Sequence, residues 1–357
     1  MSSQIIAFYL PQFYPTPEND EWWEPGFTEW TNVTRAKPLY FGHYQPRLPR
    51  DLSFYDLRVS ETRERQAALA RYAGITGFCY WHYWFAGRRM LDIPFREVVE
   101  SGKPDFPFCL CWANHSWYAK TWDANTPDKL LIEQTYPGEQ DHIDHFYAML
   151  PAFQDKRYMK VDGKLLFGIF SPLEFQDFNH FSAIWNQLAK KHGLDGFFFF
   201  GYTPSSVVAK KTESMNFDTI VMSTVREGYL YEGSAIRRMY RMFLEKMKRP
   251  FAAEYAKYVK ESIRLFRENS NYTPCIAPDF DHSPRSGRRA IMFKGSSPEK
   301  WGELCKETLE IVNERKEGEQ LIFIKAWNEW GEGNYLEPDL RFGTKYIEET
   351  FANLCDQ

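Results

Sequence analysis

Two glutamates three residues apart, Glu329 and Glu332, are the strongest candidates for chemistry in this sequence. They lie in KAWNEWGEGNYLEPD, residues 325–339, directly after the apolar run LIFI. Glycoside cleavage needs one carboxyl group that protonates the leaving oxygen and a second, ionised one that attacks or accepts a proton. Two close carboxylates in a site rimmed by aromatic rings have their pKa values pushed apart, which suits this division. Gly331 and Gly333 argue against a continuing helix and predict a tight, bent loop that directs both acids inward.

Eight apolar runs of strand length recur along the 357-residue chain, and helical patterns separate them. Most runs are continuous rather than alternating, which suits strands buried on both faces of a parallel sheet. The expected strands cover 5–10, 74–81, 106–112, 164–170, 196–202, 218–224, 272–277 and 320–327. The expected helices cover 57–73, 139–150, 181–191, 254–268, 299–316 and 344–355. This alternation predicts an α/β fold, a single (β/α)8 TIM barrel with long inserted loops over residues 1–357, with a doubly wound open sheet as the alternative.

Polar and aromatic residues gather just after these strands, where a barrel builds its working face from the βα loops. The candidate substrate-binding residues are Tyr9, Glu29, Trp30, Tyr44, Trp81, His82, Trp84, Trp112, Asn114, His115, Trp122, Asp279, Asp281, Trp327, Asn328, Tyr335 and Glu337. A flat ring with one polar handle suits the face of a sugar. We therefore expect Trp81, Trp84, Trp112 and Trp122 to be stacking platforms for sugar rings, with a place in the core as the alternative for each.

Other catalytic chemistries find less support in the sequence. His82, His115, Asp279, Asp281 and His282 could supply metal ligands, but no HxxxH or HxH spacing occurs, so we expect no metal. The absence of GxSxG argues against a serine hydrolase, and no cysteine follows a strand beside a histidine. No GxGxxG or GxxxxGK[ST] follows a strand either, and we expect no cofactor.

The charge and the apolar pattern of the sequence argue against nucleic acid as a partner and against a membrane span. The net charge is −4, and the densest basic runs lie at 237–249 in an expected helix. We interpret this helix as a solvated face rather than a nucleic-acid footprint, with contact to an acidic membrane surface as the alternative. No stretch of 18 apolar residues predicts a membrane span. The N-terminus lacks the pattern of a signal peptide, and the six cysteines form no CxxC, so we expect a cytoplasmic protein.

Four long segments of the sequence resemble the WbsX-type proteins. They are AFYLPQFYPTPENDEWWEPGFTEWTNVTRAKPLYFGHYQPRLP, GFCYWHYWFAGRRML, SGKPDFPFCLCWAN and AWNEWGEGNYLEPD. WbsX-type proteins are polysaccharide-biosynthesis glycosyltransferases related to glycoside hydrolase family 99, the endo-α-mannosidases. The resemblance extends over nearly the whole chain. It implies a (β/α)8 barrel that acts on an oligosaccharide or polysaccharide substrate.

The resemblance also implies roles for the glutamate pair. In the hydrolase relatives the acids of an NEWxEG motif are catalytic, and Glu329 and Glu332 occupy those two positions. By that resemblance Glu329 deprotonates the sugar 2-hydroxyl, which attacks C1 and forms a 1,2-anhydro sugar. Glu332 protonates the leaving oxygen and then acts as base for the incoming water or alcohol. The 2-oxygen reaches C1 from behind only when it is trans to the leaving group, as in α-mannosides and α-rhamnosides, so the anomeric configuration is retained.

The chain departs from its relatives at several motif positions. His115 stands in ANHSW where the relatives suggest an acid, DFDHSPR replaces a WDNTPR-like run, and Gly331 stands where the hydrolases usually carry His. These differences bear on the substrate more than on the catalytic pair. Two other functions stay open: a glycosyltransferase of O-antigen or lipopolysaccharide biosynthesis that uses a nucleotide sugar, and a non-catalytic glycan-binding barrel. The DFD of 279–281 is the DxD that a nucleotide-sugar enzyme could use.

Overall fold

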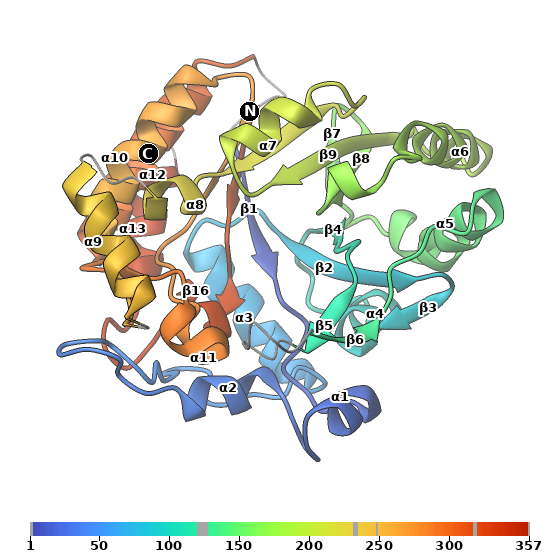
Figure 1. Cartoon of the computed structure of the whole chain (residues 1–357). Helices are drawn as coiled ribbons and strands as arrows, with labels where there is room; N and C mark the ends of the chain where they lie inside the picture. Colours follow the sequence, from blue (N-terminus) through green and yellow to red (C-terminus); the bar gives the residue numbers. More distant parts are fainter. Residues whose placement is uncertain (1–2, 120–127, 231–234, 248, 317–319, 356–357) are drawn as a thin grey trace.

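The computed structural model describes residues 3–119, 128–230, 235–247, 249–316 and 320–355. Eight parallel strands form a closed barrel (Figure 1), in the order β1-β14-β12-β10-β9-β8-β4-β2, and β2 pairs with β1 to complete it. The barrel strands are Gln4–Tyr9 (β1), Gly77–Phe85 (β2), Phe108–Trp112 (β4), Lys164–Ile169 (β8), Phe197–Thr203 (β9), Thr219–Ser223 (β10), Thr273–Ile276 (β12) and Leu321–Ile324 (β14). The predicted (β/α)8 barrel is confirmed.

The strands are buried on both faces, as their continuous apolar runs predict. All nine residues of β2 and all five of β4 are buried. Inside the barrel, aromatic rings fill the space: Phe8 stacks on Trp81 with ring centroids 4.4 Å apart and also contacts Phe323. A Cβ at Gly168 would lie 2.2 Å from the ring of Phe200, so glycine is needed where these rings come close. The interior is therefore a packed core, and chemistry is left to the strand ends.

Among the residues that the structure describes, eight helices pack around the barrel strands. Figure 1 shows their arrangement. The helices are Ser60–Tyr72 (α3), Ile93–Ser101 (α4), Glu139–Phe153 (α5), Phe178–Lys191 (α6), Ser206–Thr212 (α7), Tyr255–Glu268 (α10), Pro298–Asn313 (α12) and Lys345–Leu354 (α13). In α6, Phe178, Phe181, Trp185 and Ala189 are buried, and their spacing of three to four residues places them on one face. The six helices predicted between the strands are present, and the helix expected around the basic runs at 237–249 is observed as Ala235–Lys246 (α9).

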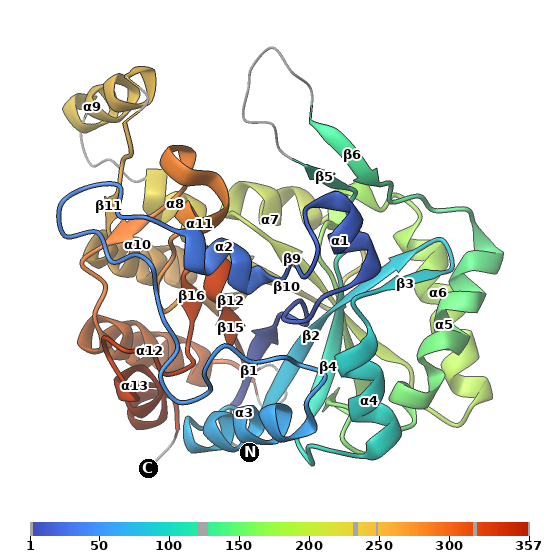
Figure 2. The same cartoon turned by 90° about the horizontal axis from the view of Figure 1, so that it is seen from below.

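Short elements fill the connections. The helices are Pro17–Trp22 (α1), Glu29–Arg35 (α2), Val225–Leu230 (α8), Ala235–Lys246 (α9) and Ser283–Ser286 (α11), and the 3-10 turns are Pro172–Glu174 (η1), Gly287–Arg289 (η2) and Trp330–Glu332 (η3). The strands are Arg88–Met90 (β3), Trp117–Ala119 (β5), Lys129–Ile132 (β6), Lys160–Val161 (β7), Ala253–Glu254 (β11), Phe293–Lys294 (β13), Asn328–Glu329 (β15) and Asn334–Tyr335 (β16). Figure 2 shows α1, α2, α9, α11 and the β5–β6 hairpin on the side of the barrel where the strands end.

One strand is longer than the sequence predicts. The expected strand ends at residue 81, yet β2 continues to Phe85 and forms an antiparallel hairpin with β3. The two turn residues, Ala86 and Gly87, both have positive φ, which gives the tight hairpin turn whose twist matches its strands. The run CYWHYWF is rich in aromatic residues and therefore favours a strand over the predicted loop. His82 and Trp84 thus belong to a strand.

Five of the six cysteines, namely Cys79, Cys109, Cys111, Cys275 and Cys305, are buried and form no disulfide. Within the described residues, none of the helices combines the length and the apolar character needed to cross a membrane. The assignment of residues 1–357 to one domain stays a prediction.

Candidate active site

Glu329 and Glu332 lie in a short hairpin that follows the last barrel strand. β15 pairs antiparallel with β16, and the 3-10 turn η3 connects them. Gly333 ends this turn with φ +62°, in the left-handed region. Gly331 has another role: a Cβ there would lie 2.3 Å from Oε2 of Glu29 and 2.9 Å from Nε of Arg285. The loop is thus bent at Gly333 and not at both glycines as predicted, and Gly331 leaves room for an ion pair.

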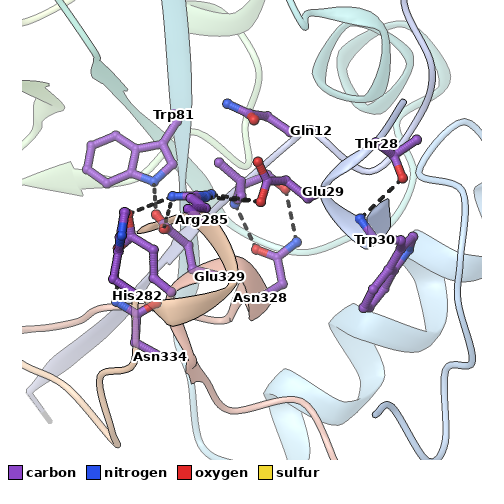
Figure 3. Close-up of polar contacts among 12 residues, drawn as sticks. Gln12, Thr28, Glu29, Trp30, Trp81, His282, Arg285, Asn328, Glu329 and Asn334 are labelled. Atoms are coloured by element: carbon purple, nitrogen blue, oxygen red, sulfur yellow. Dashed lines mark hydrogen bonds and ion pairs between the residues drawn. The ribbon is translucent and has the colours of Figure 1, made fainter. Parts of the chain in front are cut away.

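Both glutamates line one cavity of about 180 Å³ at the mouth of the barrel. The other lining residues are Leu10, Gln12, Trp81, Tyr83, Ala113, His115, Trp117, Phe170, Arg285 and Lys325. Figure 3 shows Arg285 between Glu29 and Glu329, with the indole of Trp81 above Glu329. The cavity therefore combines acids, bases and aromatic rings at the strand ends.

Glu329 is buried in this cavity and favours its neutral form. Its Oε1 accepts a hydrogen bond from the indole nitrogen of Trp81 at 2.9 Å. Burial is the largest influence and raises the pKa of Glu329 to about 7, and the negative charge of Glu332 adds to this effect. The positive charges of Lys325 and Arg285 oppose the shift without cancelling it. At neutral pH Glu329 is thus poised to hold or release a proton.

Glu332 has the opposite ionisation. Burial disfavours its charge, but Lys325 and Arg285 outweigh this and hold the pKa of Glu332 well below its usual value. Nζ of Lys325 lies 3.1 Å from Oε2 of Glu332, and Nη1 of Arg285 lies 2.7 Å from Oε1. Burial lowers the pKa of Lys325, but Glu332, Tyr202 and Glu329 together outweigh burial and hold that pKa well above its usual value. Glu332 is therefore the ionised member of the pair at neutral pH.

Arg285 connects three carboxyl groups. Its Nη1 lies 3.9 Å from Oε2 of Glu329, besides its contact with Glu332. Its Nη2 lies 3.0 Å from Oε2 of Glu29. When Glu329 is neutral, the charges of Glu29 and Glu332 balance those of Arg285 and Lys325. The cluster is electrically neutral with one proton on the glutamate pair, which is the state that a buried site favours.

Two histidines lie close to the cluster without adding charge at neutral pH. Nε2 of His282 lies 3.9 Å from Oε1 of Glu332, and burial lowers the pKa of His282 to about 4. His115 lines the cavity beside Phe170, and burial lowers its pKa as well. Both rings are therefore neutral at pH 7, and the positive charge comes from Lys325 and Arg285.

The structure brings several predicted residues together. Trp81 and His115 line the cavity with the two glutamates, and Glu29 reaches them through Arg285. The other predicted residues lie elsewhere, and Trp122 lies outside the described residues.

Three predicted residues point away from the cavity because they lie on the outer face of the barrel. Trp84 stacks on His145 of α5 with centroids 4.6 Å apart, and Nε2 of His82 lies 2.8 Å from Nε2 of that same histidine. Trp112 contacts His145 edge-on and donates to the backbone oxygen of Trp84. Neighbours in a strand face opposite sides, so Trp81 points inward while His82 and Trp84 point outward. Trp84 and Trp112 are core residues and not the predicted sugar platforms.

Other predicted residues support the site from behind. Tyr9 donates to Gln66 of α3, so its ring also lies outside the barrel. The side chain of Asn328 accepts from the backbone nitrogen of Leu10 and donates to its oxygen, which fixes the end of β1 against the hairpin. Asn114 binds Ser171 in the same way at the ends of β4 and β8. These amides position the rim of the cavity but do not line it.

A buried cluster lies behind the hairpin. Glu337 accepts hydrogen bonds from Tyr55, Gln66 and the indole of Trp330. Burial raises the pKa of Glu337 to about 7. Tyr335 stacks on Trp330 with centroids 3.7 Å apart. Glu337 and Tyr335 thus hold the hairpin in place and are not the predicted substrate contacts.

Two predicted tryptophans belong to this cluster as well. The indole nitrogen of Trp30 donates to the backbone oxygen of Tyr55, and its ring packs against Trp330. Trp327 is fully buried, with its ring against Phe78. Both rings therefore stabilise the core and are not exposed to a substrate.

Asp279 and Asp281 bind cationic and polar side chains. Nη2 of Arg47 lies 2.9 Å from Asp279 Oδ2 and 3.6 Å from Asp281 Oδ2. Asp281 also binds His43 at 2.8 Å, and Tyr44 faces the guanidinium of Arg47 at 5.7 Å. In the described part of the chain, no group of three His, Cys, Asp or Glu side chains is placed to hold a metal ion. The DxD pattern is thus a buried ion-pair network, and Tyr44 belongs to it.

Comparison with known proteins identifies the family. The sequence model named "Glycosyltransferase WbsX" matches residues 5–350. The chain belongs to the WbsX glycosyltransferase family. Two proteins named WxcX, from two strains of Xanthomonas campestris pv. campestris, are each 32% identical to this WbsX chain over 98% of its length. The WbsX chain spans about half the length of these relatives, 49% of each.

Solved structures share the fold of this WbsX chain. A glycoside hydrolase-like protein has a TM-score of 0.59 at 14% identity, with 100% of this chain and 95% of the other covered. The family 99 endo-α-mannosidase from Bacteroides thetaiotaomicron has a TM-score of 0.56 at 14% identity, covering 98% and 96%. The WbsX chain thus has the fold of these hydrolases and belongs to a family of carbohydrate-active enzymes.

Sequence reasoning missed two residues that decide the electrostatics of the WbsX site. Lys325 directly follows the apolar run of β14, and Arg285 follows the DFD segment. The sequence could have indicated Lys325, because it is the one basic residue between the end of the apolar run and the two glutamates. Nothing in the sequence places Arg285 next to Glu329 and Glu332, which follow it in the chain by 44 and 47 positions. Gln12 and Tyr83 also line the cavity, joined by a hydrogen bond.

Proposed function

We propose that this WbsX chain is a retaining enzyme that acts on α-mannoside- or α-rhamnoside-type linkages of a surface polysaccharide. The observation that carries this proposal is the glutamate pair. The two acids line one cavity and contact the same guanidinium nitrogen, yet one favours a proton and the other is held ionised. This is the division that acid–base cleavage of a glycosidic bond requires.

In the first proposed step, Glu332 accepts the proton of the sugar 2-hydroxyl while the 2-oxygen bonds to C1. The bond between C1 and the leaving oxygen breaks, and that oxygen takes the proton of Glu329. The product is a 1,2-anhydro sugar. Lys325 and Arg285 favour the ionised base, and the buried carboxyl group of Glu329 favours the protonated acid.

In the second proposed step, Glu329 is the base. It takes a proton from water or from a sugar hydroxyl, whose oxygen bonds to C1 as the epoxide opens. The 2-oxygen recovers the proton from Glu332, which restores the starting state. Two inversions at C1 retain its configuration. Whether water or a sugar hydroxyl enters decides between hydrolysis and transfer.

These roles reverse the ones that the family resemblance implies. The resemblance makes Glu332 the acid, but a proton on Glu332 would leave Lys325 at 3.1 Å and Arg285 at 2.7 Å facing a neutral group. A proton on Glu329 instead leaves both cations facing an ionised carboxylate, because Arg285 is 3.9 Å from Glu329 but 2.7 Å from Glu332. We therefore assign the acid to Glu329 and the base to Glu332.

A transferase that uses a nucleotide sugar is the second candidate, and one cavity favours it. This cavity of about 820 Å³ includes Arg285, which it shares with the glutamate site. Its other cationic lining residues are Lys246, Arg249, Arg288 and Arg289. None of the described residues that line it is acidic. Such a cluster suits a diphosphate group.

Sugar fluorides can separate the candidates, because fluoride leaves without needing a proton from the enzyme. We expect release of fluoride from α-mannosyl or α-rhamnosyl fluoride without any nucleotide, with the product retaining its configuration by NMR. Release that requires a nucleotide or nucleotide sugar would instead support the transferase. No turnover with either donor class, together with binding of the glycan, would indicate a non-catalytic barrel.

The pH dependence follows from the pair. The active form has Glu329 protonated and Glu332 ionised. Because the pKa of Glu329 lies at about 7, kcat/KM for a substrate with a poor leaving group should fall as pH rises through that value. The fall of kcat/KM at low pH should occur well below the usual pKa range of a glutamate, because Lys325 and Arg285 lower the pKa of Glu332. The range from about pH 6 to about pH 8 brackets the expected ionisation of Glu329. A value of kcat/KM that increases over this range would contradict the assignment.

A further inference from the structure

Helix α9 stands apart from the rest of the molecule. Figure 2 shows it projecting from the barrel on the side where the strands end, beyond α8 and α11. Leu244, in the C-terminal half of α9, packs against the hydrophobic core of the protein. The helix is thus attached to the working face through one side and leaves its other side uncovered.

The uncovered side carries an apolar stripe. Met239, Tyr240, Phe243 and Met247 are each more than half exposed. Met239, Phe243 and Met247 follow one another at intervals of four, so their side chains share one face, and Tyr240 lies beside them. Large apolar side chains gathered on one exposed face mark a surface that meets a partner, whereas isolated ones need no explanation.

Cations border this stripe. Residues 235–249 contain six Lys and Arg against a single Glu, although the whole chain has a net charge of −4. Arg238, Lys246 and Arg249 are exposed. Lys246 and Arg249 also line the basic cavity together with Arg288 and Arg289, so the positive field continues from the helix onto the working face. The partner of this surface is therefore anionic as well as apolar.

We infer that α9 docks the protein on an anionic phospholipid bilayer. The stripe of Met239, Tyr240, Phe243 and Met247 enters the boundary between headgroups and acyl chains, and the bordering cations contact lipid phosphates. A second copy of the chain fits less well, because it would bring two basic surfaces together. Nucleic acid would use the cations but leave the methionines and the phenylalanine exposed to water.

Docking in this way has a consequence for orientation. α9 and the strand ends lie on the same side of the barrel, so the bound protein turns its working face towards the lipid surface. Glycans attached to a membrane lipid would then meet the cavity directly. The docking rests on α9 alone and does not depend on the proposed catalytic roles.

Vesicle co-sedimentation tests the inference. The full chain should bind vesicles of phosphatidylcholine that contain about a quarter phosphatidylglycerol, and bind pure phosphatidylcholine at least about tenfold more weakly. Added salt should weaken the binding, because it screens the headgroup charge. Phe243→Glu places a charge in the stripe and should lower binding at least about tenfold. Arg238→Glu with Lys246→Glu should remove the preference for anionic vesicles.

Phe351→Glu on α13 is the matched control. Phe351 is 53% exposed and Phe243 is 57% exposed, and α13 lies near the opposite end of the barrel (Figure 2). This variant should bind vesicles as the native chain does, and all variants should keep the native melting temperature because the altered side chains are exposed. Equal binding to both vesicle types, or full binding by Phe243→Glu, would overturn the inference. A dimer that Phe243→Glu dissociates, without vesicle binding, would assign the stripe to a second copy instead.

Discussion

Glu332→Gln should abolish turnover on every substrate, sugar fluorides included. The first step needs a carboxylate to accept the proton of the 2-hydroxyl, and an amide cannot do so. We expect kcat to fall by about 10³-fold or more, whether the leaving group is a sugar or a fluoride. Release of fluoride and release of a sugar product, measured on the same enzyme preparation, provide the two rates.

Glu329→Gln should behave differently. A sugar leaving group needs the proton of Glu329, so cleavage of a natural linkage should fall by about 10²- to 10⁴-fold. Fluoride needs no proton, so the first step should be largely preserved with a glycosyl fluoride. The second step lacks its base, and added azide, which needs no deprotonation, should restore it.

The contrast between the two variants decides the roles. If Glu332→Gln keeps the fluoride reaction and Glu329→Gln loses it, the roles implied by the family resemblance hold and ours are reversed. If both variants turn over at the native rate, the pair is not catalytic. Glu303→Gln, at an exposed glutamate of α12, is the control for the amide substitution itself and should leave both rates unchanged.

Lys325→Met should change the pH dependence as well as the rate. Nζ of Lys325 lies 3.1 Å from Glu332, and its charge is the largest influence that lowers the pKa of that acid. Without it the acid limb of kcat/KM should move up by about 1 to 3 pH units, because a neighbouring opposite charge shifts a carboxyl group by that much. Glu332 must be ionised to act as the base, so a higher pKa of Glu332 causes activity to be lost at low pH. A pH–rate profile on a sugar fluoride isolates this limb.

The control for this variant is Lys294→Met, which removes an exposed lysine of β13. It should leave the profile unchanged. A uniform loss of rate in Lys325→Met, with the acid limb in its native position, would mean that Lys325 binds substrate or stabilises the loop without tuning Glu332. Lys325→Arg should restore part of the native profile, since it keeps the charge.

The sequence determined the fold and the position of the glutamate pair. Eight apolar runs predict the eight strands, because strands buried on both faces of a parallel barrel must be apolar throughout. The end of the last run places Glu329 and Glu332 at the mouth, since the chain leaves the barrel there. Both inferences depend on neighbours along the chain, which a sequence displays directly.

Only the tertiary structure decided which side chains face the cavity. The run of β2 continues past the expected end, and its alternation turns Trp81 inward and Trp84 outward. A strand of unbroken apolar and aromatic residues shows no alternation in its sequence, so its inward face cannot be read there. Trp112 lies in the core and not at the predicted sugar platform for the same reason, because β4 is also apolar throughout.

The proposed division of roles within the pair also depends on the fold. Arg285 comes from another connection of the barrel and reaches Glu29, Glu329 and Glu332. Its charge and that of Lys325 decide which of the two acids holds the proton, because electrostatic energy depends on distances in space and on burial. The sequence determined that two carboxyl groups meet at the end of a barrel strand. The tertiary structure decided that Glu332 is the ionised one.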